Sequence, residues 1–362
     1  MQDYTQLFDR VRGTLLGGAI GDALGWPIEF LQLEQIRERY GPDGVDGFLP
    51  GRDPGAPQQI TDDTQMTLFT AEGLLRLPPG IDPAPVLQHA YLRWLRTQRD
   101  QAPGPAPDGW LASQPFLYAR RSPGQACMSG LDLQEREYRA PGQLGEPGPV
   151  NSDSKGCGTV MRSAPFGLAG FGPDLAFTMA ARCAQLTHGH PTGYLAAGVF
   201  AALIDRVLHG VELRVAVQQT IAQIDGGPAS EETVAALRRA VTVADDGEPS
   251  AEQVEQVGAG WVAEECLAVA VYCALVAERT TDLRGALLLS VNHSGDSDST
   301  GAVAGNLLGA LHGLSALPMD WASKLEGRDE LVQVADDLVM NFHVGDRTTL
   351  GPRYPLDTPV PK

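Results

Sequence analysis

The chain has 362 residues, of which 43% are hydrophobic, and it carries a formal net charge of −18. This length allows a large core, and the acidity disfavours broad contact with nucleic acid or an anionic membrane. Five cysteines without a repeated metal-ligand spacing argue against a disulfide framework. The N-terminus lacks the apolar stretch of a signal peptide, and no uncharged apolar run is long enough for a membrane span. We therefore expect a soluble cytoplasmic protein, by default a monomer.

Apolar residues recur at helical spacing along most of the chain, and no convincing series of strands is present. The first such segment, residues 11–31, carries glycines four apart from Gly13 to Gly25. Small residues on one face let the backbone of another helix approach closely, so this segment belongs at the centre of a helical bundle. The predicted helices are residues 11–31, 62–77, 84–97, 174–187, 194–208, 211–224, 231–243, 260–277 and 325–342, together with one that begins after Asp296 and has its apolar face at Val303, Leu307 and Leu311.

The remaining segments are rich in glycine and proline. Residues 41–59, 100–115 and 122–150 have no hydrophobic period and are predicted to be loops. Loops this long in a compact domain are usually functional or disordered. We predict one all-α domain over residues 1–350, followed by a Pro-rich tail over residues 351–362.

Two predicted helices begin with clustered acids. Thr61-Asp62-Asp63-Thr64 precedes one helix, and Asp296-Ser297-Asp298-Ser299 precedes the other. Either motif alone is typical of helix capping. Four aspartates brought together would, however, repel one another unless a cation compensates them. The carboxylates and hydroxyls of these motifs provide only oxygen ligands, which suit Mg²⁺ or Mn²⁺ rather than Zn²⁺. Four carboxylates carry more charge than one such ion neutralises, so two ions that share bridging ligands are favoured.

Three other places carry weaker signals. Glu29 comes just after Pro27, where the glycine-rich helix is expected to end or kink, and on pattern alone it fits a surface acid at a helix end equally well. Residues 156–158, Gly-Cys-Gly, precede a helical run and indicate an anion-binding turn or, by about two to one, a purely structural turn. Residues 187–191 contain two histidines, a pattern that fits a hydrogen-bonded turn better than a metal site.

Taken together, five motifs in this order resemble the ADP-ribosylglycohydrolase family over nearly the whole chain, roughly from Arg12 to Gly313. The motifs are GTLLGGAIGDALGWPIEF, TDDTQMTLFTAEGLL, GCGTVMRSAP, THGHP and HSGDSDSTGAVAGNLLGALHG. One such motif would be weak, but five in order are specific. The family includes the dinitrogenase reductase-activating glycohydrolase and the ADP-ribosylarginine and ADP-ribosylserine hydrolases. The resemblance implies a single-domain orthogonal helical bundle that releases ADP-ribose from an acceptor.

The resemblance also implies roles for individual residues. The ligands of two Mg²⁺ ions, with Mn²⁺ as an alternative, would be Thr61, Asp62, Asp63, Asp296, Asp298 and Ser299. The catalytic carboxylates would be Glu29, Asp62 and Asp298. Substrate contacts would come from Glu29, Gly156, Cys157, Gly158, Met161 and His188. Many members carry Asp-x-Asp-Thr in the last motif, whereas here Ser299 takes the threonine position and Thr300 follows, so either hydroxyl is a candidate ligand.

Three classes of function follow from these residues. The first is a metal-dependent hydrolase that removes ADP-ribose from a modified protein side chain, with arginine favoured because the acidic protein suits a cationic acceptor. Serine-linked, nucleic-acid-linked and small-molecule conjugates remain open within this class. The second is a binuclear-metal nucleotide phosphohydrolase, which four aspartates alone would permit. The third is a non-catalytic relative, which the presence of all four aspartates and Glu29 disfavours.

Overall fold

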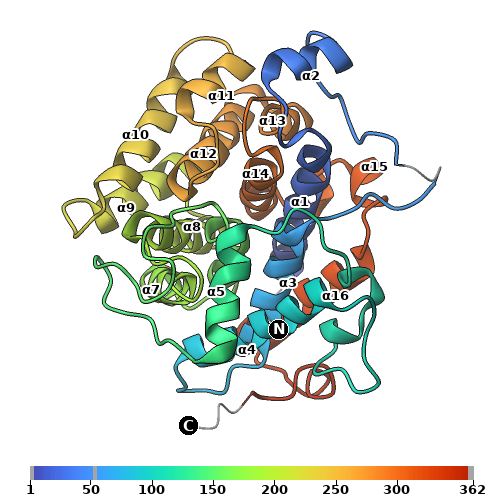
Figure 1. Cartoon of the computed structure of the whole chain (residues 1–362). Helices are drawn as coiled ribbons and strands as arrows, with labels where there is room; N and C mark the ends of the chain where they lie inside the picture. Colours follow the sequence, from blue (N-terminus) through green and yellow to red (C-terminus); the bar gives the residue numbers. More distant parts are fainter. Residues whose placement is uncertain (1–3, 52–54, 358–362) are drawn as a thin grey trace.

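The computed structural model describes residues 4–51 and 55–357, and within these ranges the protein is all-α, as predicted (Figure 1). Two isolated bridges, Gln58 with Leu325 and Gly156 with Val262, are the only β-type pairings in that part of the chain. The α-helices in chain order are α1 (Thr5–Gly25), α2 (Leu33–Tyr40), α3 (Asp62–Leu75), α4 (Pro83–Arg99), α5 (Gln125–Arg136), α6 (Ala164–Leu168), α7 (Pro173–Ala184), α8 (Pro191–Leu208), α9 (Leu213–Ile224), α10 (Glu231–Asp245), α11 (Ala251–Val257), α12 (Ala263–Thr280), α13 (Leu283–Leu289), α14 (Ser297–His312), α15 (Met319–Ala322) and α16 (Arg328–Val339).

Helices α1 and α14 pack backbone against backbone at the centre of the molecule (Figure 1). A Cβ on Gly21 would lie 1.9 Å from the carbonyl oxygen of Gly301. A Cβ on Gly17 would likewise lie 2.3 Å from the carbonyl oxygen of Gly305. The close approach predicted from the glycine spacing is therefore present. Because the pairs run in opposite directions along the two helices, the C-terminal end of α1 meets the N-terminal end of α14.

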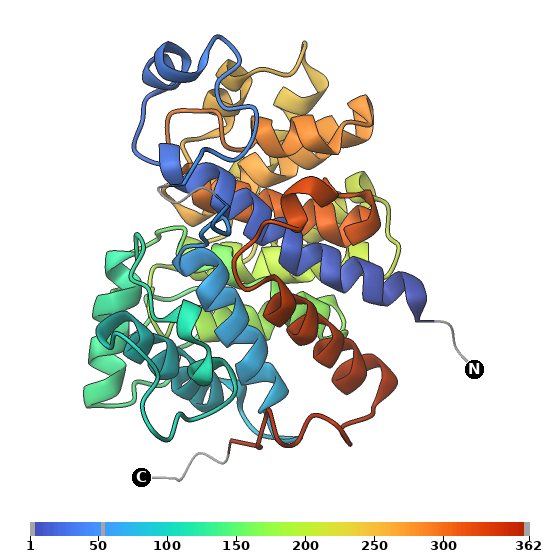
Figure 2. The same ribbon diagram turned by 90° about the vertical axis from the view of Figure 1, so that its right-hand side faces the viewer.

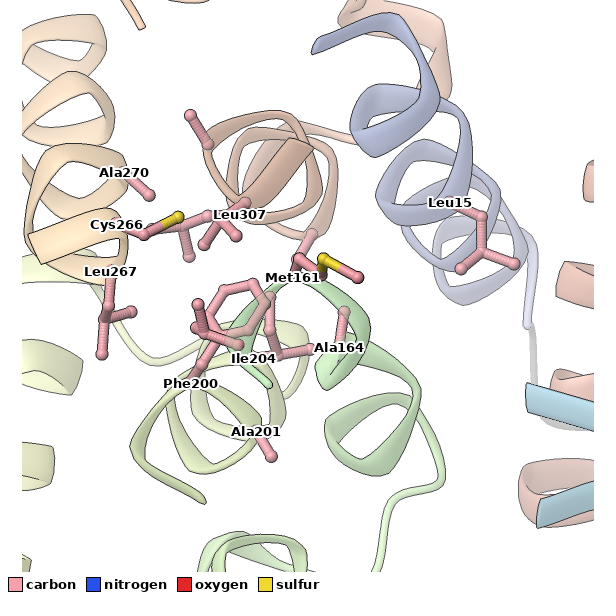
Figure 3. Close-up of a cluster of buried hydrophobic side chains, with 14 of the residues drawn as sticks. Leu15, Met161, Ala164, Phe200, Ala201, Ile204, Cys266, Leu267, Ala270 and Leu307 are labelled. Carbon is pink, nitrogen blue, oxygen red and sulfur yellow. The ribbon is translucent and has the colours of Figure 1, made fainter. Parts of the chain in front are cut away.

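The apolar core lies between α8, α12 and α14. Figure 3 shows Phe200 and Ile204 of α8 pointing toward Leu267 of α12 and Leu307 of α14, and these four side chains are buried. Among the described residues, α8 is the one helix long and apolar enough to cross a bilayer, but 89% of that stretch is buried inside the fold. Its composition is thus explained by its place in the core.

One predicted loop was wrong, because residues 122–150 contain helix α5. The buried residues Cys127, Leu131 and Gln134 lie along one face of this helix. Their helical spacing is present in the sequence, but the glycines and prolines on either side obscure it. Helix α2 also forms within a stretch for which we predicted no helix.

The Pro-rich segment after residue 350 packs against the helices as far as it is described (Figure 2). The Tyr354 hydroxyl is buried and donates to the Asp337 carboxylate at 2.9 Å. Asp357 accepts from Arg93 Nη1 at 3.1 Å. Residues 358–362 of the predicted tail lie outside the described residues, and the domain boundary at residue 350 stays a prediction.

Candidate active site

The two acidic helix starts and the turn that follows α1 meet in one cavity of about 730 Å³. Asp62 and Asp63 come from the start of α3, Asp296 and Asp298 from the start of α14, and Glu29 from the turn after the 3-10 helix η1 (Trp26–Ile28). One carboxylate oxygen from each of Glu29, Asp296 and Asp298 lies within 4.8 Å of the other two. Acids from opposite ends of the chain therefore converge, and these three carboxylates, the carboxylate trio, form a candidate metal site.

Local packing explains this convergence. A Cβ on Gly25 would lie 2.1 Å from the carbonyl oxygen of Ser297, so glycine lets the end of α1 reach the start of α14. The Asp22 carboxylate of α1 accepts from the Thr61 amide at 3.0 Å and from the Thr64 amide at 3.2 Å. Asp22 therefore caps α3 from a neighbouring helix and fixes where its aspartates point.

The cavity concentrates negative charge away from water. Burial, followed by the nearby Asp298 charge, raises the pKa of Asp22 to about 7 and that of Glu29 to about 8. The same two causes raise the pKa values of three more aspartates well above their usual range, namely Asp62, Asp63 and Asp296. Crowded, desolvated carboxylates favour the protonated form unless a cation is bound.

Two buried carboxylate oxygens lack a hydrogen-bond partner among the described residues, and this favours a bound cation. They are Glu29 Oε2 and Asp63 Oδ1. An unpaired buried acceptor is costly, and a hard divalent ion would satisfy Asp63 Oδ1 and neutralise the charge around Glu29. The donor set of this cavity therefore fits a metal such as Mg²⁺ or Mn²⁺.

The structure separates the three candidate hydroxyl ligands. Ser299 lines the cavity. The Thr300 hydroxyl lies 2.9 Å from His293 Nε2 and donates to the Ser290 carbonyl at 2.8 Å, away from the cavity. Thr61 is absent from the described cavity wall, and its hydroxyl accepts from the Asp63 amide at 3.3 Å. The geometry favours Ser299 over Thr300, while the roles of Ser299 and Thr61 as ligands stay predictions.

The Gly156–Gly158 loop forms another part of the cavity wall. The Cys157 amide donates to the Trp261 carbonyl at 3.1 Å, and its thiol donates to Asp296 Oδ2 at 2.8 Å. A Cβ on Gly158 would lie 3.1 Å from His188 Cε1, so the glycine lets the imidazole lie against the loop. Burial and the Arg162 charge lower the pKa of His188 to about 3, which leaves this imidazole neutral.

Apart from Thr61, all predicted site residues line this cavity, including Met161 and His188. Sequence reasoning missed several other lining residues: Phe30, Arg120, Ser122, Pro123, Gly124, Gln125, Ala126, Ser154 and Trp261. The Gly124 amide donates to Asp62 Oδ2 at 3.2 Å, which joins the start of α5 to the acidic cluster. The available signal was the helical spacing of Cys127, Leu131 and Gln134, which begins directly after the lining residues 123–126.

Comparison with known proteins agrees with this geometry. A family model described as ADP-ribosylglycohydrolase matches residues 3–347. The chain is 28% identical to the ADP-ribosyl-(dinitrogen reductase) glycohydrolase of Rhodospirillum rubrum, and the match covers 89% of this chain and 92% of that protein. It is 26% identical to an ADP-ribosylarginine hydrolase of Pseudomonas putida, with 92% of this chain and 78% of the relative covered.

A solved structure gives the same result. It is described as an ADP-ribosylglycohydrolase-related protein complex, and it superposes with a TM-score of 0.62 at 28% identity. The superposition covers 92% of this chain and 98% of the solved one. The chain therefore belongs to the ADP-ribosylglycohydrolase family and is a hydrolase that acts on ADP-ribose conjugates.

Proposed function

We propose that this protein hydrolyses the glycosidic bond between ADP-ribose and the guanidinium group of an ADP-ribosylated arginine in a protein, with two Mg²⁺ ions or, alternatively, Mn²⁺. The observation that carries the proposal is the carboxylate trio, which shares its cavity with Asp62 and Asp63 and leaves two carboxylate oxygens unpaired. The similarity to an ADP-ribosylarginine hydrolase supports arginine as the acceptor.

The proposed ligands combine both acidic helix starts: Thr61, Asp62, Asp63, Asp296, Asp298 and Ser299. Glu29 lies beside Asp296 and Asp298 and would act as a proton acceptor next to the ions. When bound, divalent ions of this kind orient sugar hydroxyls and lower the pKa of a bound water. Cys157 would hold Asp296 in place through its thiol hydrogen bond at 2.8 Å. The neutral His188 pairs its Nδ1 with the Thr187 hydroxyl at 2.8 Å, so its Nε2 is left to contact the substrate.

The chain's own residues would share the chemistry as follows. Hydrolysis forms a bond between the water oxygen and the anomeric carbon while the bond to the acceptor nitrogen breaks. Positive charge develops on the ribose, and the surrounding carboxylates stabilise it. Glu29 accepts a proton from the water and passes it to the departing guanidine nitrogen, so that arginine leaves as its guanidinium, the anomeric carbon keeps the water hydroxyl, and Glu29 is ionised again.

A panel of conjugates tests the proposal. Arginine-, serine- and guanine-linked ADP-ribose are incubated with the protein and either Mg²⁺ or a chelator, and free ADP-ribose is measured. We expect release from the arginine conjugate with Mg²⁺ and loss of release with the chelator. Release of phosphate or nucleoside monophosphate would instead indicate a phosphohydrolase. Binding of ADP-ribose without any release would indicate a non-catalytic relative.

A further inference from the structure

Two aromatic side chains at the cavity wall have no role in the chemistry described so far. Phe30 is 70% exposed and Trp261 is 42% exposed, although both line the cavity. Their rings stack on each other, with centroids 5.5 Å apart and planes inclined by 20°. Large exposed aromatic groups beside a polar cavity are typical of binding surfaces. We call Phe30 and Trp261 the aromatic pair.

The backbone places the aromatic pair directly beside the reacting carboxylates. Phe30 immediately follows Glu29. Trp261 immediately follows Gly260, where a Cβ would lie 3.5 Å from the Asp296 Cβ. The Trp261 carbonyl is also fixed by the Cys157 amide at 3.1 Å. Phe30 is thus next in sequence to Glu29 of the carboxylate trio, and Trp261 is next to Gly260, whose backbone passes close to Asp296.

We propose that the aromatic pair is the subsite for the acceptor, and that it holds the guanidinium group of the modified arginine by stacking. This rests on the proposed function, because it assumes that the ribose whose glycosidic bond is broken binds next to the carboxylate trio. The acceptor is bonded directly to the anomeric carbon of that ribose. The adenine ring, in contrast, is separated from it by two ribose rings and a diphosphate, so a surface beside the trio is placed for the acceptor.

The chemistry of the pair selects a planar cation. A guanidinium stacks on aromatic faces and is weakly hydrated, so it gains both cation–π attraction and apolar contact. The neighbouring carboxylates add attraction for a positive charge. The side chain of a serine acceptor carries no charge and has no planar group, and it would gain little from these rings. The aromatic pair would therefore determine specificity for the acceptor without taking part in bond cleavage.

Steady-state kinetics with small conjugates test the subsite. Trp261→Ala and Phe30→Ala are compared with wild type on ADP-ribosylarginine and ADP-ribosylserine as free amino-acid conjugates. We expect each variant to raise KM for the arginine conjugate by about tenfold while kcat stays unchanged. KM for the serine conjugate and the affinity for free ADP-ribose should stay at the wild-type value. Phe30→Leu, which keeps an apolar side chain but removes the ring, should behave like Phe30→Ala.

A matched control is Tyr138→Ala, since Tyr138 is 39% exposed and lies outside the described cavity wall. This variant should leave all parameters unchanged. An unchanged KM for the arginine conjugate in both alanine variants would overturn the proposal. An equal loss of ADP-ribose affinity would also overturn it, because the rings would then bind the ADP-ribose itself.

Binding of agmatine, a small guanidinium compound, separates the subsite from the enzymatic activity. Agmatine is titrated into protein saturated with ADP-ribose, by calorimetry and tryptophan fluorescence. We expect wild type to bind agmatine and both alanine variants to bind it about tenfold more weakly. If wild type cleaves no conjugate, the proposed function fails, yet this loss of agmatine binding would still support the subsite. No agmatine binding by wild type, or equal binding by the variants, would exclude it.

Discussion

At the scale of single residues, Glu29 shows how surroundings change the chemistry of a common side chain. It is only 7% exposed, and one of its oxygens lies within 4.8 Å of oxygens from Asp296 and Asp298. Glu29 Oε2 lacks a hydrogen-bond partner among the described residues. A carboxylate in this position is costly for folding, and such groups cluster at functional sites.

Replacing Glu29 with glutamine should therefore keep the fold and remove the proton acceptor. We expect Glu29→Gln to lower kcat by about 10²- to 10⁴-fold, the usual contribution of a general base. Release of ADP-ribose from the arginine conjugate measures the rate, and thermal unfolding checks the fold. Glu34→Gln, at an exposed position on α2, is the control and should retain full activity. A wild-type rate in Glu29→Gln would remove this residue from the mechanism.

The two neighbouring hydroxyls of α14 should respond differently to mutation. Ser299→Ala removes a hydroxyl that lines the cavity, and we expect it to raise the Mg²⁺ concentration needed for activity by about tenfold. Thr300→Val removes buried hydrogen bonds to His293 and Ser290, and it should cost about 1–3 kcal/mol of stability. Mg²⁺ titrations and chemical denaturation of both variants measure these effects. The reverse pattern would identify Thr300 as the ligand.

Sequence reasoning identified the acids at the helix starts but not all of the residues that position them. Asp62 and Asp298 were found because clustered acids before an apolar helical face stand out. Asp22 was given no role in the sequence analysis, although an acid within a glycine-rich apolar helix was itself a signal. Phe30 and Trp261 could not be found, because a single aromatic residue has no pattern and their stacking depends on the tertiary fold.

At the scale of elements, the fit of α1 against α14 depends on glycine. Gly21→Ala would place a Cβ 1.9 Å from the Gly301 carbonyl oxygen, so the two backbones must separate. We expect the free energy of unfolding to fall by about 1–3 kcal/mol, as for an overpacked core. Activity should also fall, because the same contact aligns Glu29 with the start of α14. Chemical denaturation and ADP-ribose release measure the two effects.

Gly104→Ala is the control for this prediction, since a Cβ there would meet no heavy atom within 4 Å. It should leave stability and activity close to the wild-type values. Equal stability of Gly21→Ala and Gly104→Ala would show that the close approach of the two helices is not required.

The sequence predicted the main helices well and their connections less well. The glycine spacing in α1 correctly indicated a close helix partner, because it is regular and local. The identity of that partner and its antiparallel direction depend on contacts between distant parts of the chain, which no local pattern encodes. Helix α5 was missed for the opposite reason, since local glycines and prolines concealed a short buried face around Leu131.

At the scale of the whole molecule, the acidic cavity should couple stability to pH. The folded-state pKa values of Asp22, about 7, and of Glu29, about 8, lie well above the value near 4 expected for an unfolded chain. Folding therefore favours the protonated forms, and their contribution to stability is lost as the pH rises through 7 and 8. Without divalent ions, the melting temperature should therefore fall as the pH rises from about 5 to about 8 and should level off above that.

Magnesium should largely remove this pH dependence, because a bound cation favours the ionised carboxylates. Thermal unfolding across this pH range, with chelator and with excess Mg²⁺, measures the effect. Glu29→Gln should flatten the part of the decline near pH 8. A melting temperature that is constant or rises with pH in chelator would contradict the prediction.

The backbone contact between α1 and α14 also has a consequence for synthesis of the protein. Residues near the N-terminus leave the ribosome first, and their glycine face has no partner until almost all of the polypeptide has been made. Contacts between such distant segments form late in folding. The enzyme should therefore be inactive as a nascent chain, and a product that terminates before α14 should have neither a complete core nor a complete set of carboxylates.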